Sequence, residues 1–431
     1  MRLHDTPSRK WLSHLSRTSS ASLAVLAACT VAHFSNHLYT GALSPFMPII
    51  QDELTLNLTQ VGLITSTSVF TMTASHLFVG YLSDRGLRDF LISMSILATA
   101  AVVLLTSLSE TILFLIVCQA LLGLAASSYH PCAFPALTEK FPDSSRATAT
   151  GIQAAGGLVG MTVVPALGVT LLVLLGGWRQ SLFVLGLLGF VLFSPAFALM
   201  RYSRRERSAE CKSVITDENV QGWSRSYVLV LVVSSLRGIP FRCTVLMMPV
   251  YLVARFGYQP VWAGSLTTVM LASGLLAELM SAPVSDKLRR RVPFIIASNG
   301  FMTFCLILLN TPLDETSLVL VLVGIGFSYF LGEPANEALQ TEVSPAKSRG
   351  VAFGLIFSIG AFPGALAPLV FGSLGDAYGL SASILFLVTT TALAAAVSVL
   401  LREAHQNADA AKRRQHSWKP MSGKSPNSAS P

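Results

Sequence analysis

GYLSDRGLR, at residues 80–88, and APVSDKLRRR, at residues 282–291, are two short stretches with one shared pattern. Each has a small residue, three further residues, an aspartate, a cation and then more cations. Long apolar runs flank both stretches, so each is a tight charged connection between two hydrophobic helices. Their occurrence in the first and second halves of the chain predicts a protein built from two related parts.

The composition excludes an ordinary soluble protein. Of the 431 residues, 52% are hydrophobic and only 12% are charged, whereas a soluble domain carries about 25% charged residues. A formal net charge of +8 would suggest nucleic acid in a soluble protein. Here the basic residues lie in short segments between apolar runs, where they set membrane orientation. We therefore expect the lipid bilayer, and no nucleic acid, as a partner.

The apolar runs predict an all-α integral membrane protein. A membrane-crossing helix needs about 20 mostly apolar residues. Twelve runs meet this requirement, at residues 21–44, 58–82, 90–108, 111–137, 147–175, 179–200, 226–254, 261–284, 292–310, 315–341, 348–374 and 379–401.

A polar, charged stretch at 201–225 divides these runs into two sets of six, which predicts six-helix bundles at 21–200 and 226–402. The polar N-terminal segment, 1–20, precedes a full-length apolar run without an A-x-A cleavage site, so we expect it to be retained, although its Arg and Ser content also permits a transit peptide. Residues 403–431 are rich in Lys, Ser, Asn and Pro and predict a disordered tail.

The distribution of positive charge predicts the orientation. All but four of the 30 Lys and Arg residues fall at the N-terminus, in alternate connections or in the C-terminal tail. Arg179 and Arg255 lie in the other connections, while Arg237 and Arg242 lie inside the seventh helix. The positive-inside rule then places both termini in the cytoplasm. We expect the protein to lie in the inner (plasma) membrane of a cell.

The two halves repeat beyond the two charged stretches. An offset of 203 places His130–Pro131 on Glu333–Pro334, and an offset of 201 places Met47–Pro48 on Met248–Pro249. Six helices is an even number, so the two repeats have the same orientation. Parallel six-helix repeats are typical of transporters that expose a central site alternately to the two sides.

The charged stretches are candidate gates. A small residue lets helices approach closely. An aspartate that faces a helix N-terminus, or pairs with a cation across the interface between the halves, can form a contact in one conformation and lose it in another. The pattern resembles the GxxxDRxGR signature of the major facilitator superfamily, which implies two pseudo-symmetric six-helix bundles. Loop charges that only set topology are the alternative. The candidate gating residues are Gly80, Asp84, Arg85, Arg88, Asp286, Lys287 and Arg289.

A narrower resemblance covers most of the N-terminal half. HFSNHLYTGAL at 33–43 and GLAASSYHP at 123–131 look like segments of fosmidomycin-resistance-type transporters, a family that exports small drugs, including an anionic phosphonate, against proton entry. That family usually has an acid where this chain has His37. Three residues of the fifth helix resemble part of the GxxxGPxxG motif of drug:proton antiporters, although Val164 replaces a glycine: Gly160, Pro165 and Gly168.

Polar residues within the tenth predicted helix form one stripe. Glu333, Asn336, Glu337 and Gln340 are spaced i, i+3, i+4 and i+7, so they should face a cavity. Arg237 lies at a compatible depth for an ion pair with Glu333. We interpret Glu333 as a proton carrier whose partner changes between states; a pair that only fixes helix packing is the alternative.

Three histidines are further candidates for proton coupling. His33 and His37 share one face of the first helix, and His130 is the counterpart of Glu333. Asn36, on the same first helix, is the counterpart of Arg237. Histidine titrates near neutrality, although a neutral histidine bonded to a neighbouring helix is an alternative. A metal needs three or four convergent ligands, which two histidines on one helix do not supply, so no metal site is expected. Arg242 either attracts anions to the cavity or extends toward the membrane surface.

These residues predict a secondary transporter rather than an enzyme. The sequence contains no GxxxxGK[ST] motif for nucleotide binding, so the energy must come from an ion gradient or from the gradient of the substrate itself. We favour proton-coupled efflux of a small organic compound by alternating access, with no cofactor and no obligate protein partner. The alternatives are uptake or exchange of an organic anion or metal chelate, a membrane-embedded enzyme, and a transporter-like sensor. The candidate substrate and proton-coupling residues are His33, Asn36, His37, His130, Arg237, Arg242, Glu333, Asn336 and Glu337.

Overall fold

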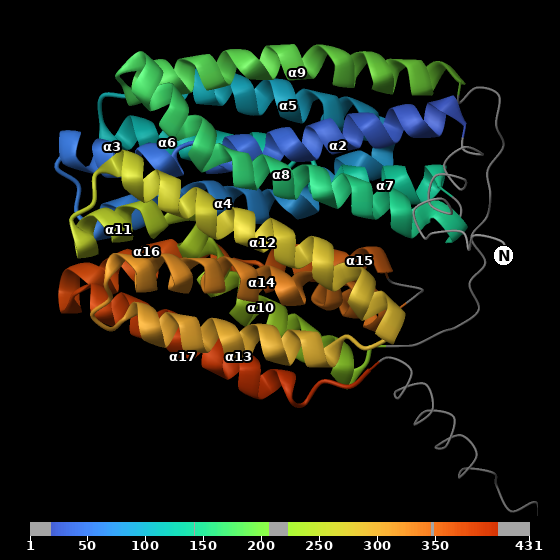
Figure 1. The fold of residues 1–431 in the computed structure, drawn as a ribbon. Coiled ribbons are helices and arrows are strands. Elements are labelled where there is room, and N and C mark those ends of the chain that lie inside the picture. The colour runs from blue at the N-terminus through green and yellow to red at the C-terminus, as the bar shows by residue number, and fades with distance from the viewer. Residues whose placement is uncertain (1–18, 142, 207–222, 346–348, 404–431) are drawn as a thin grey trace, which may run out of the picture.

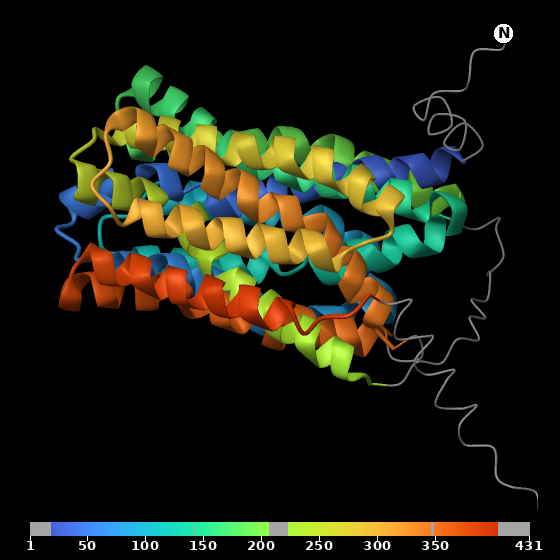
Figure 2. The ribbon, with the colours of Figure 1, turned by 60° about the horizontal axis from the view of Figure 1, so that its bottom comes forward.

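The computed structural model describes residues 19–141, 143–206, 223–345 and 349–403, and every regular element in these ranges is helical. The helices run along a common direction, and the first half of the chain, coloured blue to green, packs beside the second half, coloured yellow to red (Figure 1). Figure 2 shows the same bundle turned about the horizontal axis.

The first half contains eight α-helices and two short helices of other types within the described residues. They are α2 (Ser20–Gly41), the 3₁₀ helix η1 (Ser44–Phe46), α3 (Met47–Glu53), α4 (Leu58–Leu82), the π-helix η2 (Ser83–Leu87), α5 (Arg88–Thr106), α6 (Ile112–Ala126), α7 (His130–Lys140), α8 (Asp143–Leu175) and α9 (Trp178–Glu206).

The second half repeats this layout within its described part. Its elements are α10 (Arg225–Leu246), α11 (Met248–Phe256), α12 (Pro260–Leu288), α13 (Val292–Leu309), α14 (Glu315–Val343), α15 (Arg349–Leu355), the π-helix η5 (Ile356–Gly360), α16 (Phe362–Tyr378) and α17 (Leu380–Ser398).

Eleven helical stretches of the described chain are long and apolar enough to cross a membrane. One of them, Leu58–Thr106, has 49 residues, which would span about 73 Å at 1.5 Å per residue, far more than the bilayer core of about 30 Å. Gly86 interrupts it with a φ of 87°, a left-handed conformation that favours glycine. The chain turns there, so this stretch provides two crossings and the total of twelve agrees with the prediction.

Several predicted helices are interrupted or extended. The predicted run 21–44 continues through η1 and α3 to Glu53, and the run 226–254 is divided between α10 and α11. The run 111–137 is divided between α6 and α7, with turns at residues 127–129. Prolines in the first turns of α3, α7 and α11 explain these new starts, since proline cannot continue the preceding hydrogen-bond ladder.

The predicted connections also differ at their edges. Helix α9 continues to Glu206, inside the predicted loop 201–225. Glu403, predicted to begin the disordered tail, is 7% exposed and its carboxylate accepts hydrogen bonds from the Arg291 and Val292 amides at the start of α13. Most of the predicted segments 1–20 and 201–225, and residues 404–431, lie outside the described residues.

Small residues let α12 and α14 pack closely. A Cβ atom added at Gly326 would lie 1.8 Å from the Met270 carbonyl oxygen, and one added at Gly274 would lie 2.3 Å from the Phe330 ring. Close backbone approach of this kind stabilises helix pairs in lipid, where van der Waals packing replaces the hydrophobic effect.

Gly326→Val is therefore expected to lower the free energy of unfolding by about 3 kcal/mol or more, because the new side chain collides with backbone rather than with a flexible side chain. Thermal unfolding of the purified protein in detergent measures the change. Gly300→Val is the matched control, since a Cβ atom there meets nothing within 4 Å. Equal unfolding temperatures for the two variants would contradict this packing.

The two ends of the bundle differ, and we name them by charge. The basic end carries the connections 83–87 and 289–291, and the opposite end carries the turns at Gly257 and Gly379. At the opposite end the Asp376 carboxylate of α16 accepts hydrogen bonds from the Leu58 amide at 3.0 Å and the Thr59 amide at 2.7 Å. An aspartate of one half therefore caps α4 of the other half and joins the two bundles there.

Candidate functional site

The break between α6 and α7 positions His130. Helix α6 ends at Ala126, whose carbonyl oxygen accepts a hydrogen bond of 2.8 Å from the Asn36 side-chain amide of α2. The Tyr129 hydroxyl donates to the Cys29 carbonyl oxygen at 2.9 Å. Asn36 thus satisfies a carbonyl group at the end of the interrupted helix, as broken membrane helices require, and Tyr129 ties the turn to α2.

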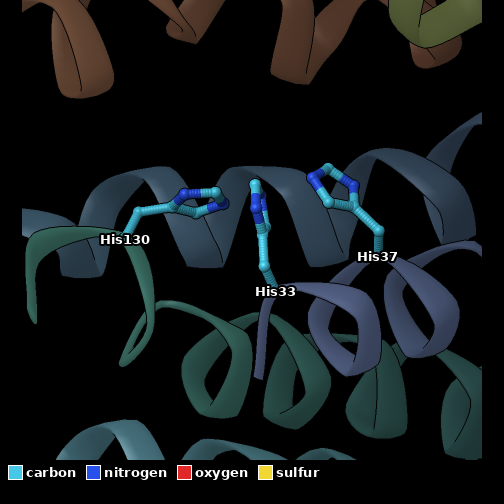
Figure 3. A group of neighbouring side chains, drawn as sticks. All are labelled: His33, His37 and His130. Carbon is cyan, nitrogen blue, oxygen red and sulfur yellow. The ribbon is translucent and has the colours of Figure 1, made fainter. Parts of the chain in front are cut away.

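Three histidines meet beside this break. Their ring centroids lie 4.9 Å apart for His33 and His37, 5.3 Å for His33 and His130, and 6.1 Å for His37 and His130. Figure 3 shows His33 between the other two rings, with His33 and His37 on one helix and His130 on another. One ring nitrogen from each residue lies within 4.8 Å of the others. The histidines that the sequence places on two helices therefore form one cluster.

Contacts with α8 fix the orientation of His33. Its Nδ1 lies 2.9 Å from the Gln153 main-chain oxygen, and its ring stacks on Tyr129 with centroids 4.9 Å apart. A Cβ atom added at Gly157 would lie 2.5 Å from the His33 ring. Only glycine leaves room for the imidazole at that position.

Two of the antiporter-like residues of the fifth predicted helix lie where α8 packs against α2 and η1. A Cβ atom added at Gly160 would lie 2.3 Å from the Phe34 carbonyl oxygen, and one added at Gly168 would lie 2.6 Å from the Pro45 ring. Pro165 lies inside α8 between them. The two glycines thus let α8 pack closely against α2, which carries His33 and His37, and against η1.

His76 of α4 is a fourth histidine that the sequence analysis missed. Its ring lies 6.1 Å from that of His130, and the residue is 6% exposed. Its Nδ1 lies 3.3 Å from the Phe357 carbonyl oxygen, and its buried Nε2 has no hydrogen-bond partner within the described residues. The repeat contained a signal for it, because the offset of 202 that aligns the two charged stretches also aligns His76 with Glu278.

The predicted contact between Arg237 and Glu333 forms in the second half. Arg237 Nη2 lies 3.0 Å from Glu333 Oε2, with 2% of the arginine side chain and 23% of the glutamate side chain exposed. The guanidinium also donates to Ser298 Oγ and Asn299 Oδ1, each at 2.8 Å, and to the Tyr329 carbonyl oxygen at 3.0 Å. The arginine is thus anchored by neutral groups as well as by the carboxylate.

The face of the second half that corresponds to the histidine cluster is acidic. Glu278 of α12 interacts electrostatically with Glu333 and Glu337 of α14. Asn336 is buried, and its side-chain oxygen accepts a hydrogen bond of 3.2 Å from Ser234 Oγ of α10. Glu337 is exposed. At two pairs of equivalent positions, His130 with Glu333 and His76 with Glu278, the repeat has therefore kept an ionisable group while exchanging histidine for glutamate.

Arg242 lies between the halves. It lines a pocket with His37 and Met72 of the first half and with Phe241 of its own helix, and its guanidinium carbon lies 5.4 Å from the Phe241 ring centroid. None of the ion pairs within the described residues involves Arg242. The side chain thus faces the cavity between the halves rather than the membrane surface.

The candidate gating residues make contacts within each half in this conformation. Arg88 pairs with Glu139 at 2.6 Å. In the second half the pairing cation is Arg291, which is not among the candidate gating residues: it pairs with Asp286 at 2.6 Å and with Glu342 at 3.2 Å. Arg88 and Arg291 therefore each join neighbouring helices of one half at the basic end through ion pairs. The expected contacts across the two halves are not among these pairs.

Three features of these segments explain the differences from the prediction. Arg289 has a left-handed φ of 51° and ends α12, so the pairing cation comes two residues later. Arg85 stacks on Tyr81, with its guanidinium carbon 4.4 Å from the ring centroid, while Asp84 and Lys287 are exposed. A Cβ atom added at Gly80 meets nothing within 4 Å, so the expected close helix approach is absent there.

Comparisons with known proteins agree with this architecture. The sequence profile of the Major Facilitator Superfamily matches residues 29–368 and, in a second match, residues 230–427. The chain is 24% identical over 386 residues to a probable sulfoacetate transporter of Cupriavidus necator, covering 82% of this chain and 87% of that protein. It is 24% identical over 362 residues to the fosmidomycin resistance protein of Escherichia coli, with the same two coverages.

A solved structure shares the fold. A bacterial homologue of the human lysosomal transporter Spinster, in an inward-facing and unoccupied conformation, superposes with a TM-score of 0.70 at 15% identity, covering 88% of this chain and 96% of that chain. The profile matches, the relatives and the twelve crossings show a multi-pass membrane protein that transports small organic compounds and is not an enzyme. The chain belongs to the Major Facilitator Superfamily.

Proposed function

We propose that this transporter carries a small organic anion and couples its movement to protons, with export as the net direction. The single observation that carries the anion proposal is Arg242, a guanidinium that lies in the pocket between the halves and takes part in none of the ion pairs of the described residues. A cation in such a place attracts an anionic ligand, and arginine binds carboxylate or phosphonate groups through two parallel hydrogen bonds.

The relatives support the same class of substrate. Sulfoacetate, named for one of them, carries a carboxylate and a sulfonate group. The fosmidomycin resistance protein supports the export direction through its name. The basic end, in this proposal, faces the cytoplasm with both chain termini, as the charge distribution predicts.

Glu333 is the proposed proton carrier. Its side chain is partly exposed, whereas its partner Arg237 is buried and holds three further hydrogen bonds with Ser298, Asn299 and the Tyr329 carbonyl oxygen. Protonation of the carboxylate therefore leaves the guanidinium bonded to neutral groups, which reduces the cost of breaking a buried pair. Glu278 and Glu337 lie within electrostatic reach and are the nearest further acceptors.

Arg242→Gln tests the anion proposal. The substitution should raise the half-saturating concentration of an anionic substrate roughly 10- to 100-fold, because it removes hydrogen bonds from a charged donor. Everted membrane vesicles with a pH-sensitive dye report proton movement while cationic, neutral and anionic compounds are added in turn.

Arg255→Gln is the control, because Arg255 is exposed at the end of α11 and lies outside the residues that line the pocket. Proton movement caused by anions alone, weakened by Arg242→Gln and unchanged by the control, supports the proposal. A response confined to cationic compounds, or an unchanged response of the Arg242 variant, would overturn it.

A further inference from the structure

We propose that His33, His37 and His130 form a binding site for a divalent transition-metal ion of the Zn²⁺ class, with one coordination position left open to the cavity. The site goes beyond the transport function, and it does not depend on the proposed direction of transport or on the driving ion. The sequence supplies two of these ligands on one helix; the broken helix α6–α7 supplies the third.

The chemistry and spacing of the three rings fit such an ion. Neutral imidazole is a common ligand of zinc, copper and nickel. In a tetrahedral site with Zn–N bonds of 2.0–2.1 Å the ligand nitrogens are about 3.4 Å apart. The three nitrogens lie within 4.8 Å of one another. Side-chain rotations that move each nitrogen by roughly 1 Å would therefore bring them to the spacing of a zinc site.

The surroundings of His33 match those of a metal ligand. Metal-binding histidines usually donate their second ring N–H to a backbone carbonyl or a carboxylate, which fixes the tautomer and the ring direction. His33 Nδ1 lies 2.9 Å from both the main-chain oxygen and the side-chain nitrogen of Gln153. In the tautomer that donates to the main-chain oxygen, Nε2 keeps its lone pair for a metal.

His76 adds a buried ring nitrogen beside the cluster. The residue is buried, with 6% of its surface exposed, and its ring lies 6.1 Å from that of His130. Its Nε2 has no hydrogen-bond partner within the described residues. An unpartnered buried nitrogen is costly unless a ligand or water satisfies it. His76 is thus placed to interact with a group bound to the metal.

The positive charge of Arg242 influences which charged species can bind at the histidine cluster. It lines the same pocket as His37, and its positive charge acts on both His37 and His130. The guanidinium repels a bare divalent cation, whereas an anion bound beside it offsets that repulsion and can fill the open position on the metal. The arrangement therefore favours a metal ion that arrives with an anionic chelator over a free aqueous ion.

Zinc binding by the full-length purified protein tests the site. The protein is prepared in detergent without a polyhistidine tag and titrated with Zn²⁺ against a fluorescent chelator. One equivalent should bind to the native chain, and His37→Gln and His130→Gln should each weaken binding by at least about tenfold. Arg242→Gln should instead tighten it several-fold, because a like charge is removed.

Two controls separate this site from other zinc ligands. Joint replacement by glutamine of the four histidines outside the described residues should leave the affinity unchanged: His4, His14, His405 and His416. Cys132→Ser, which alters a buried thiol in the same half, should also leave it unchanged.

X-ray absorption at the zinc edge of the native chain should show imidazole nitrogens at about 2.0 Å, a readout that requires no variant to fold. Absence of binding, sulfur ligands in the spectrum, loss of binding in either control, or undiminished affinity in both histidine variants would each overturn the proposal.

Discussion

Glu333→Gln is expected to reduce substrate-dependent proton movement to background while the protein still folds. Glutamine has the same shape as glutamate and can accept the hydrogen bond that Arg237 donates to Glu333 at 3.0 Å, but it cannot carry a proton. Arg237 also keeps its bonds to Ser298, Asn299 and the Tyr329 carbonyl oxygen. The variant therefore separates loss of coupling from loss of structure.

The size of the effect follows from the energy of the gradient. One proton that crosses 100 mV supplies about 2.3 kcal/mol, which supports a concentration ratio of roughly 50. Without coupling, the variant should only equilibrate its substrate, so the steady-state ratio in vesicles should approach one. Exchange of labelled for unlabelled substrate at equal concentrations, which needs no proton, should continue.

Glu315→Gln is the matched control, since it makes the same change in the first turn of the same helix, at an exposed site. Its proton movement should equal that of the native chain. Coupled proton movement that persists in Glu333→Gln would exclude Glu333 as the carrier and direct attention to Glu278 or Glu337.

Gly372→Val is expected to abolish transport by keeping the two halves apart at the opposite end. A Cβ atom at this position would lie 2.1 Å from the Leu58 carbonyl oxygen of the other half, and one at Gly62 would lie 2.3 Å from the Pro368 carbonyl oxygen. These contacts join α4 to α16 rather than helices of one half. Each bundle should therefore fold, while the closed arrangement at that end becomes inaccessible.

Labelling measures this effect directly. A cysteine placed at Thr65, which is 5% exposed between the halves, should resist a membrane-impermeant thiol reagent in the native background. The same cysteine should react when combined with Gly372→Val. Gly151→Val, where an added Cβ meets nothing within 4 Å, should leave both labelling and transport unchanged. An unreactive cysteine in the Gly372 variant would show that closure tolerates the valine.

Much of the fold is visible in the sequence because hydrophobic length is a local property. The apolar runs predict twelve crossings, and the structure contains them once the turn at Gly86 is counted. The exact interruptions are less predictable, since Pro131 permits either a kink or a new helix. Hydrogen bonds from distant residues decide this, such as the one from Asn36 to the Ala126 carbonyl oxygen.

The candidate site was only partly predictable for a similar reason. The ion pair of Arg237 and Glu333 followed from matching depths in two helices. The histidine cluster did not, because its third member, His130, stands at the break between α6 and α7, whose position the sequence does not give. Arg291 was also missed, since three consecutive arginines offer no local reason to prefer the last one. Asp376 lies in α16 and caps α4, a pairing that no sequence spacing reveals.

The exchange of histidine for glutamate between equivalent positions has an evolutionary consequence. A chain that arose by duplication began with two identical halves, so a dimer of the present first half would have only histidines at these positions and a dimer of the present second half only glutamates. Fusion of the two copies let His76 and His130 diverge from Glu278 and Glu333. Selection can now alter the imidazole side, and with it the cargo, without disturbing the carboxylates on which energy conversion is proposed to depend.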